Sequence, residues 1–280
     1  VFASISGFGR GGPYADWPGV DQIAQGMSGL MSLTGHPETG PTRVGIPIAD
    51  VVAGMWAALG VQAALLERER TGKGQLVETS LLGGLIGLLN LQGQRELSLG
   101  DTPGVAGNDH PSVCPYGLFH AKDGPFNMAA ATDEMWAKLC RLLGMEELIT
   151  HPDYKDNSAR FRNRAEVKRI LNEKFAARGK MEWTLELVKL GLPAGPILSL
   201  DQVFSDPHVL ASGMVEEVEH PRLGRMRAMA NPIRTAALAG RSVRRAPPAL
   251  GQDSREVLAD YGIAPGEIDA LIAAGVVQCA

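Results

Sequence analysis

The chain has 280 residues, of which 45% are hydrophobic, and it contains 34 glycines and 18 prolines. This length allows two lobes with substantial cores, and the composition excludes a disordered or fibrous protein. The formal net charge of −4 excludes a global basic field. We therefore expect no nucleic-acid partner.

The cysteines and histidines are dispersed along the chain. No two of the three cysteines form a C-x-x-C pair, and no two of the six histidines form an H-x-x-x-H pair. We therefore expect neither a disulfide framework nor a metal site. The longest apolar run, Leu81 to Leu91, is interrupted by glycines and too short to span a bilayer, and no signal peptide is visible. The expectation is a reduced, cytoplasmic protein without a membrane partner.

The first third of the chain alternates strand and helix patterns. Residues 1–6 predict a buried strand, and the Gly- and Pro-rich residues 7–20 predict a loop. Because a buried strand needs neighbours in its sheet, we expect further elements either upstream of Val1 or on another chain. Residues 21–33 predict a helix. Asp50 is expected to be the N-cap of a second helix of roughly 18 residues.

That second helix has a broad apolar face and a charged end. Its apolar positions include Met55 and Leu59, and Gly72 is expected to end it. A short strand is predicted at residues 75–78, after which Ser80 is expected to cap a glycine-rich helix. This alternation predicts an α/β fold with a mostly parallel sheet and helices on its faces.

The composition changes after residue 92. Residues 93–113 are polar and rich in Gly and Pro, which is typical of a linker. Lys122-Asp123-Gly124 predicts a hairpin turn, and Thr132 is expected to cap a helix that runs to Leu143. The hairpin strands are predicted at residues 116–121 and 125–131. The other predicted elements are helices at 164–177, 181–190, 255–261 and 265–274, a strand at 193–198, and a hairpin of 215–219 with 225–229.

The segment Gly7-Phe8-Gly9-Arg10-Gly11-Gly12 fits the G-x-G-x-x-G pattern and follows the first predicted strand. In a dinucleotide-binding fold a helix opens directly on these glycines, so that its N-terminus meets the pyrophosphate. Here Pro13 and Pro18 leave no room for a long helix. A turn that needs a positive φ is therefore favoured over a nicotinamide-cofactor site.

Asp50 has two interpretations. A lone aspartate before an apolar helix is most often an N-cap. The preceding residues 44–49 are small and apolar, however, so a substrate could approach closely over Gly45 and Ala49. A carboxylate at a helix N-terminus is stabilised as the anion and lies beside N–H groups that can stabilise an oxyanion. Such a carboxylate can attack an activated acyl carbon without a partnering base.

The other polar candidates have a structural and a functional interpretation each. Asp21 follows the glycine loop and could orient a substrate, although helix capping is the commoner role. His110 precedes a proline in the predicted linker, where a solvated or backbone-bonded histidine is favoured. For the loop cations Arg10, Arg43 and Lys73, a plain surface role is favoured over that of a phosphate ligand.

An ordered series of motifs resembles the class III CoA-transferases, the family that includes formyl-CoA transferase and carnitine CoA-transferase. The series covers essentially the whole chain and is highly specific. It comprises S-I-S-G-F-G-R-G-G-P (4–13), G-x-x-x-x-D (45–50), T-G-K-G-Q (71–75), H-P-S-V-C-P-Y-G-L-F (110–119), K-D-G (122–124), G-L-P-A-G-P-I (191–197), S-D-P-H-V (205–209) and L-G-Q-D-S-R-E-V-L near the C-terminus.

This resemblance implies a Rossmann-like large α/β domain, with an open and mostly parallel sheet, and a smaller α+β domain. The corresponding ranges are 1–92 for the large domain, 93–113 for a linker, 114–210 for the small domain and 211–280 for a segment that returns to the large domain. It also implies an interlocked homodimer. Family members carry further residues before the glycine loop, so the 280-residue chain is expected to lack part of the large domain and of the CoA-binding surface.

The resemblance also implies the chemistry. Asp50 matches the family's catalytic aspartate, which attacks an acyl-CoA thioester to give a mixed anhydride and then an aspartyl-CoA thioester. The acceptor is a small carboxylic acid, and coenzyme A enters as a substrate thioester without a metal. Residues assigned to the CoA site are Gly7, Phe8, Gly9, Arg10, Gly45 and Asp21.

Two alternatives follow from the same resemblance. The related α-methylacyl-CoA racemases use a histidine in a G-H-D unit, where this chain has Gly19-Val20-Asp21. Because valine cannot carry a proton, a two-base racemase is disfavoured. The other alternative is a chain that binds a partner and performs no chemistry by itself.

Overall fold

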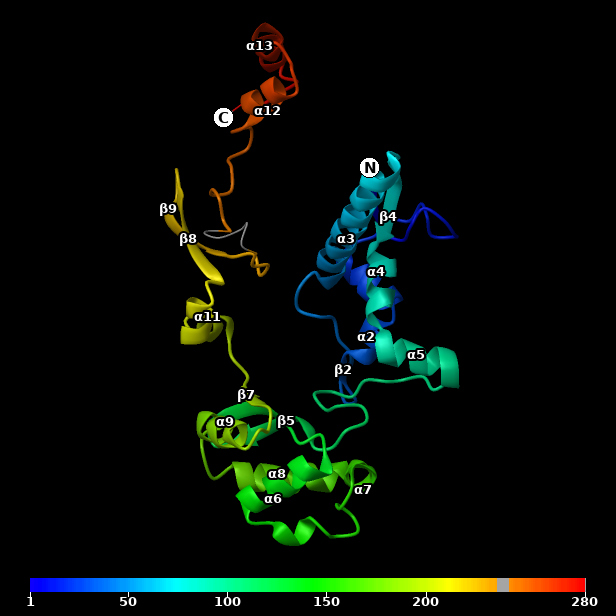
Figure 1. The fold of residues 1–280 in the computed structure, drawn as a ribbon, viewed down its shortest axis with the longest axis vertical. Helices are drawn as coiled ribbons and strands as arrows, with labels where there is room; N and C mark the ends of the chain where they lie inside the picture. Colours follow the sequence, from blue (N-terminus) through cyan, green and yellow to red (C-terminus); the bar gives the residue numbers. More distant parts are fainter. Residues whose placement is uncertain (236–241, 280) are drawn as a thin grey trace. The chain divides into compact units, whose positions relative to one another are not determined.

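The computed structural model describes residues 1–235 and 242–279 (Figure 1). Contacts divide the chain into two units, Val1–Ile197 and Leu198–Ala280, which are described separately. The predicted domain boundaries at residues 92, 113 and 210 stay predictions. Residues 236–241 and 280 of the predicted C-terminal segment lie outside the described residues.

Strands β1 (Phe2–Ser6) and β4 (Leu76–Ser80) pair in parallel, with Phe2 opposite Leu76 and Ser6 opposite Ser80. The predicted strands and their parallel direction are therefore present, while a wider sheet with helices on both faces stays a prediction. The expected burial of residues 1–6 is wrong for this structure. Phe2 and Ile5 are 63% and 50% exposed, because only β4 is hydrogen-bonded to β1 among the described residues.

The helix predicted over residues 21–33 is two helices, α1 (Asp21–Met27) and α2 (Leu30–Leu33). Gly29 separates them with a φ of 86°, a left-handed conformation that a continuous helix cannot contain. The prediction of one helix is therefore wrong at this glycine. A short antiparallel pair, β2 (Gly35–His36) and β3 (Gly40–Pro41), follows α2.

The long helix α3 (Ile48–Thr71) has 24 residues and ends, as predicted, at Gly72 with a φ of 72°. Its buried positions are mostly alanines, whereas Met55 and Leu59 of the predicted apolar face are more than half exposed. Among the described residues α3 is long and apolar enough to cross a membrane by length and composition alone, so the apolar run 81–91 is not the longest. Core helices of soluble proteins meet the same criteria, and the absence of a membrane partner stays a prediction.

Helices α4 (Leu81–Leu88) and α5 (Asn90–Leu99) complete this part of the chain. The Ser80 hydroxyl accepts a hydrogen bond from the Gly83 N–H, which confirms the predicted cap. Helix α5 occupies the start of the predicted 93–113 linker, so the extended linker begins only at Gly100. A small core joins α1, α3 and α4 through Ala24, Ala49, Ala53, Leu81 and Leu85.

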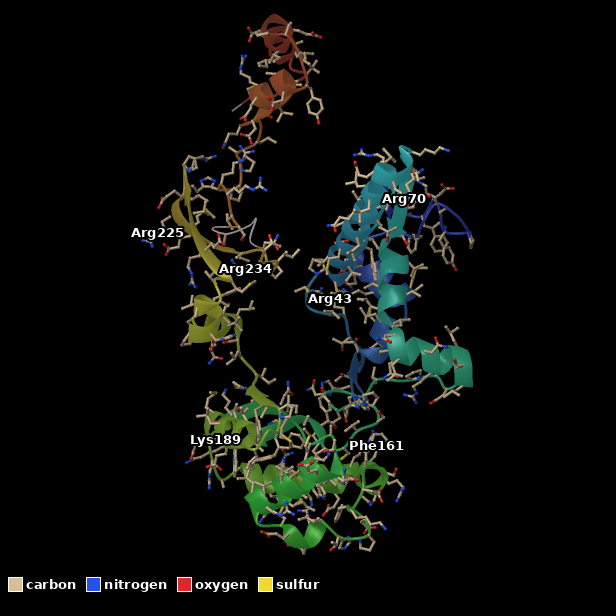
Figure 2. The ribbon with its side chains drawn as sticks, in the orientation of Figure 1. Arg43, Arg70, Phe161, Lys189, Arg225 and Arg234 are labelled. Atoms are coloured by element: carbon tan, nitrogen blue, oxygen red, sulfur yellow. The ribbon has the colours of Figure 1, made fainter. Side chains whose placement is uncertain are left out.

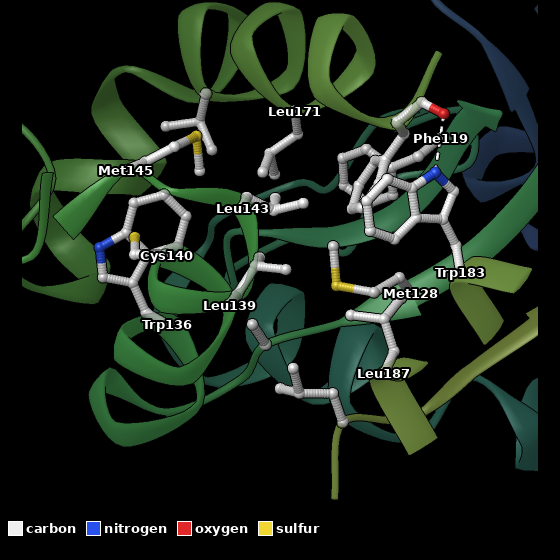
Figure 3. Packing of buried hydrophobic residues seen from close by; sticks show 14 of the residues in the cluster. Phe119, Met128, Trp136, Leu139, Cys140, Leu143, Met145, Leu171, Trp183 and Leu187 are labelled. Atoms are coloured by element: carbon white, nitrogen blue, oxygen red, sulfur yellow. Dashed lines mark hydrogen bonds between the residues drawn. The ribbon is translucent and has the colours of Figure 1, made fainter. Parts of the chain in front are cut away.

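The rest of the first unit surrounds a larger core, shown in Figure 3. The predicted hairpin and its flanking helices are present. In the core the Trp183 indole N–H donates to the Phe175 carbonyl at 2.8 Å. The elements are β5 (Tyr116–Ala121), β6 (Gly124–Ala129) and β7 (Ala194–Pro196), which form one antiparallel sheet, α6 (Asp133–Leu143), the 3₁₀ turn Glu146–Leu148, α7 (Asn157–Arg162), α8 (Arg164–Phe175) and α9 (Lys180–Lys189).

The second unit contains the predicted second hairpin and both predicted terminal helices. Each predicted boundary is correct to within one residue. Its described elements are α10 (Leu200–Val203), α11 (Pro207–Ala211), the antiparallel strands β8 (Val215–His220) and β9 (Gly224–Met229), α12 (Ser254–Asp260) and α13 (Pro265–Ala273).

Candidate active site

Asp50 lies in the first turn of α3, as the third helical residue, and the N-cap is Pro47. The prediction that Asp50 is the N-cap is therefore wrong. Helix α3 begins earlier because two of its first N–H groups have other acceptors. The Ala49 N–H donates to Asp21 Oδ1 at 2.9 Å, and the Ile48 N–H donates to the Ile46 carbonyl at 2.8 Å.

Asp21 thus serves the start of α3 rather than the start of its own helix. It is the first residue of α1, whose N-cap Val20 makes no side-chain cap bond. While Oδ1 accepts from Ala49, Oδ2 accepts from Gln25 Nε2 at 2.8 Å. The substrate-orienting role of Asp21 stays a prediction, and the structure adds a contact between helices that the sequence did not suggest.

Gln25 is fully buried, and the sequence did not identify it as a candidate residue. Its Oε1 accepts from the Val44 N–H at 2.8 Å, and its Nε2 also reaches the Ile46 carbonyl at 3.5 Å. A polar residue four positions after Asp21 on the buried face of a helix is the pattern that could have found it. Together the two side chains hold the segment that leads into α3.

The Asp50 side chain is exposed and has no hydrogen bond or ion pair within the part of the chain that the structure describes. In that same part, its main-chain N–H has no acceptor either. A free carboxylate and a free N–H therefore share one residue at the positive end of a helix. This arrangement suits a nucleophile that needs no activating base.

The glycine loop is a set of turns and not a helix start. Gly9 and Gly12 have φ values of 93° and 88°, and the Gly9 N–H donates to Ser6 Oγ at 3.0 Å. The next helix along the chain begins only at Asp21, so no helix opens on the glycines. The geometry that a dinucleotide fingerprint requires is absent here.

Gly7 and Gly19 bring the two ends of the loop into contact. A Cβ atom on Gly7 would lie 2.8 Å from the Gly19 Cα, and one on Gly19 would lie 2.7 Å from the Gly7 Cα. The Gly7 carbonyl also accepts from the Leu82 N–H at 3.1 Å. Since Gly19 is two residues from Asp21, which binds Ala49, this chain of contacts places the base of the loop near Asp50.

Phe8, assigned to the CoA site from the sequence, is buried beneath two other rings. Its ring centroid lies 6.1 Å from that of Tyr14 and 6.3 Å from that of Trp17, both edge-on. Tyr14 and Trp17 are themselves exposed, with centroids 4.3 Å apart. Tyr14 and Trp17 therefore form the apolar surface that the loop offers to a ligand. Their spacing of three residues is the sequence signal that could have indicated this surface.

Arg10 is held by other side chains, whereas the space around Gly45 is open. Arg10 pairs with Glu78 at 3.0 Å and donates to Ser4 Oγ at 3.1 Å, beside a hollow of about 410 Å³ whose lining includes four hydroxyl side chains and three glycines. A Cβ on Gly45 would meet nothing within 4 Å, which agrees with close approach of a substrate. Ala49 is fully buried, so the expected approach over Ala49 is wrong.

Two of the three loop cations flank α3: Arg43 precedes the helix and Lys73 follows it. Figure 2 labels Arg43 beside the start of the helix and Arg70 near its end. Lys73 follows the end of α3 and is separated from Asp50 by about 30 Å of helix, at about 1.5 Å per residue. Lys73 is therefore not a neighbour of Asp50.

His110 is bonded to the backbone. Its Nδ1 accepts from the N–H groups of Ser112 and Val113, at 3.2 and 3.1 Å, and its ring stacks on Tyr116. The proton of the neutral ring is then on Nε2. Among the described residues no group of three or more His, Cys, Asp or Glu side chains could hold a metal ion.

The class of protein follows from these features: an α/β protein with an unpaired aspartate in the first turn of a long helix, beside a glycine-rich loop. The sequence model of CoA-transferase family III matches residues 1–254. The chain belongs to this family.

The individual relatives are longer than this chain. It is 34% identical to a succinyl-CoA:glutarate CoA-transferase of Mus musculus over 99% of its own length and 64% of the relative's. It is also 34% identical to a succinate–glutarate CoA-transferase of Agrobacterium fabrum, over 93% of the chain and 65% of that protein. A crystal structure of a CAIB/BAIF family protein from Brucella suis matches with a TM-score of 0.80 and 35% identity, covering 93% of this chain and 67% of that one.

Proposed function

We propose that the protein transfers coenzyme A from an acyl-CoA thioester to a carboxylic acid, with Asp50 as the nucleophile. The observation that carries the proposal is the exposed, unpaired Asp50 carboxylate at the start of α3. Family membership supplies the substrate class, because the relatives are named as CoA-transferases that act on succinate and glutarate.

The reaction begins when an Asp50 oxygen attacks the thioester carbonyl carbon. The C–S bond breaks, the CoA thiolate leaves with the electron pair, and a mixed anhydride remains on Asp50. The thiolate then attacks the Asp50 acyl carbon and expels the donor's carboxylate, which leaves an aspartyl-CoA thioester. The acceptor carboxylate then attacks the aspartyl-CoA thioester and expels the CoA thiolate, which gives a second mixed anhydride. The thiolate attacks the acyl carbon of the acceptor and releases the Asp50 carboxylate, so that Asp50 is regenerated and no proton is consumed.

Three features of the structure support this sequence of steps. The N-terminal end of α3 stabilises negative charge, both on the resting carboxylate and on the tetrahedral intermediates. The free Asp50 N–H is a candidate donor to the developing oxyanion. The open space at Gly45, five residues before Asp50, supports close approach of a thioester.

For the substrates we propose succinyl-CoA as donor and a small dicarboxylic acid such as glutarate as acceptor. This choice follows the substrates in the names of the mouse and Agrobacterium relatives. The interlocked homodimer and the cytoplasmic location are likewise proposals, made from the family resemblance. A racemase would need a base where Val20 stands, and Val20 is an exposed hydrophobic residue at the N-cap of α1.

The proposal is tested with D50N, which keeps the shape of the side chain and removes the nucleophilic oxygen. We expect transfer from succinyl-CoA to glutarate to fall by at least about 10³-fold. The free energy of unfolding should fall by no more than about 1 kcal/mol, because D50N removes only the favourable charge at the start of α3 and no hydrogen bond or ion pair among the described residues. Mass spectrometry after hydroxylamine trapping should find the modified peptide at Asp50 in the wild type only.

The matched control is D260N, an exposed aspartate in the second unit. It should retain full activity. Transfer by D50N at the wild-type rate would contradict the assignment. Assays of this chain alone, and of a longer protein that contains it, distinguish an enzyme from a chain that only binds a partner.

A further inference from the structure

The buried amide of Gln25 is hydrogen-bonded on both sides, although Gln25 has no place in the proposed reaction. Its Nε2 donates to Asp21 Oδ2 at 2.8 Å and to the Ile46 carbonyl at 3.5 Å, and its Oε1 accepts from the Val44 N–H at 2.8 Å. The residue is 0% exposed, so water cannot replace these bonds. Three of its four hydrogen-bonding positions are therefore used within the protein.

The orientation of this amide is set by its partners. Turning it over would bring the NH₂ group against the Val44 N–H and the oxygen against the Asp21 carboxylate. Both contacts would be repulsive, and three bonds would be lost in a buried site. Gln25 therefore has one stable orientation, and it links α1 to residues 44 and 46 on the segment before α3.

Asp21 extends the same connection to α3 itself. Its two oxygens are shared between Gln25 Nε2 and the Ala49 N–H, at 2.8 and 2.9 Å. Ala49 is fully buried and is the residue directly before Asp50. The position of the Asp50 backbone therefore depends on bonds to residues 25 and 29 positions earlier in the chain.

We propose that Gln25, through Asp21 and the Val44–Ala49 segment, is a positioning residue that holds Asp50 where it can attack the thioester. This inference rests on the proposed function of Asp50. A displacement of about 1 Å in a reacting group can cost about 10²-fold in rate. The loss falls on kcat, because the substrate-binding surface does not include the buried amide.

Two variants test the inference. Q25M keeps the length of the side chain and removes all three bonds. Q25E keeps an acceptor for the Val44 N–H but places a carboxyl against Asp21, so that the contact to Asp21 is attractive only when the two groups share a proton. The matched control is S28A, since the Ser28 hydroxyl is buried at the C-terminal end of α1 and, within the described part of the chain, bonds to the Gln25 carbonyl and the Leu30 N–H.

The kinetic readout is transfer from succinyl-CoA to glutarate. For Q25M we expect kcat to fall by about 10²-fold while KM changes less than about threefold. For Q25E, kcat relative to the wild type should rise as the pH is lowered from about 8 to about 5, because the shared proton restores the contact. S28A should keep the wild-type kcat and show no such pH dependence, even if it is less stable.

Hydrogen exchange measured by mass spectrometry separates this inference from the proposed function. Peptides covering residues 42–52 should exchange faster in Q25M than in the wild type and S28A. An active wild type with unchanged kcat in Q25M would overturn the positioning role and leave the proposed function in place. A wild type without transfer activity would overturn the proposed function, and unchanged exchange in Q25M would then also overturn the connection between Gln25 and the start of α3.

Discussion

Asp21 and Asp50 are both aspartates in the first turn of a helix, and their surroundings give them different roles. Both oxygens of Asp21 accept hydrogen bonds, from the Ala49 N–H and the Gln25 amide. The Asp50 carboxylate has no hydrogen bond or ion pair among the described residues. The side chain whose lone pairs are engaged supports the structure, and the side chain whose lone pairs are free is available for chemistry.

The cysteines lead to a prediction at the scale of single residues. Burial raises the pKa of Cys114 to about 11 and that of Cys140 to about 12, while Cys279 is partly exposed. Near pH 8 we therefore expect a thiol reagent such as DTNB to modify one thiol of the native chain, at Cys279, and all three after unfolding.

The same two thiols predict how stability changes at high pH. In the unfolded chain their pKa values are close to 9, so the unfolded state loses these protons first. The free energy of unfolding should fall as the pH rises from about 9 toward 11. Urea titrations of the wild type and of a C114A/C140A variant measure this, and an equal pH dependence in both would contradict the prediction.

At the scale of elements, the beginnings of helices show what sequence patterns can and cannot predict. Ser80 and Thr132 cap their helices as expected, because each hydroxyl accepts from an N–H three residues ahead. The start of α3 could not be predicted in this way. Its N–H donor at Ala49 is satisfied by Asp21, which is distant in the sequence and close only after folding.

The contact between Gly7 and Gly19 predicts a position that tolerates no side chain. In G7A the added Cβ would lie 2.8 Å from a backbone atom, so one of the two chain segments must move. We expect a loss of about 1–3 kcal/mol in the free energy of unfolding. Chemical denaturation of G7A measures this loss.

Gly11 provides the control for that substitution. A Cβ on Gly11 would meet nothing within 4 Å, so G11A should change the free energy of unfolding by less than about 0.5 kcal/mol. Equal stability of G7A and G11A would show that the close approach of the two loop ends does not restrict residue 7.

At the scale of the whole molecule, the boundary between the two units falls in a short exposed segment of the chain. Ile197 and Leu198 are about 40% exposed, and Leu200 is 73% exposed. We expect chymotrypsin, under native conditions, to cut first near Leu198–Leu200, because these leucines are exposed and lie at the boundary between the units. Mass spectrometry of the first fragments checks this, and first cuts between residues 116 and 189 would contradict it.

The sequence predicted the helices and strands better than it predicted which side chains are buried and what they contact. The hairpins, the C-terminal helices and the family itself followed from turn residues, periodicity and motifs. The burial of Phe8 and Ala49 did not, because it depends on which segments meet in three dimensions. Gln25 was missed for the same reason: a buried polar residue becomes recognisable only when its partners are known.

The bond between Asp21 and Ala49 also has a consequence for the order of events during folding. Before α1 docks, the Ala49 N–H has only water as an acceptor, and we expect the first turn of α3 to fray. We expect this turn to become ordered when α1 docks and supplies the Asp21 carboxylate. An incompletely folded chain would therefore display Asp50 on a disordered end, where it is a poor nucleophile, and reactivity would arrive together with the native contact.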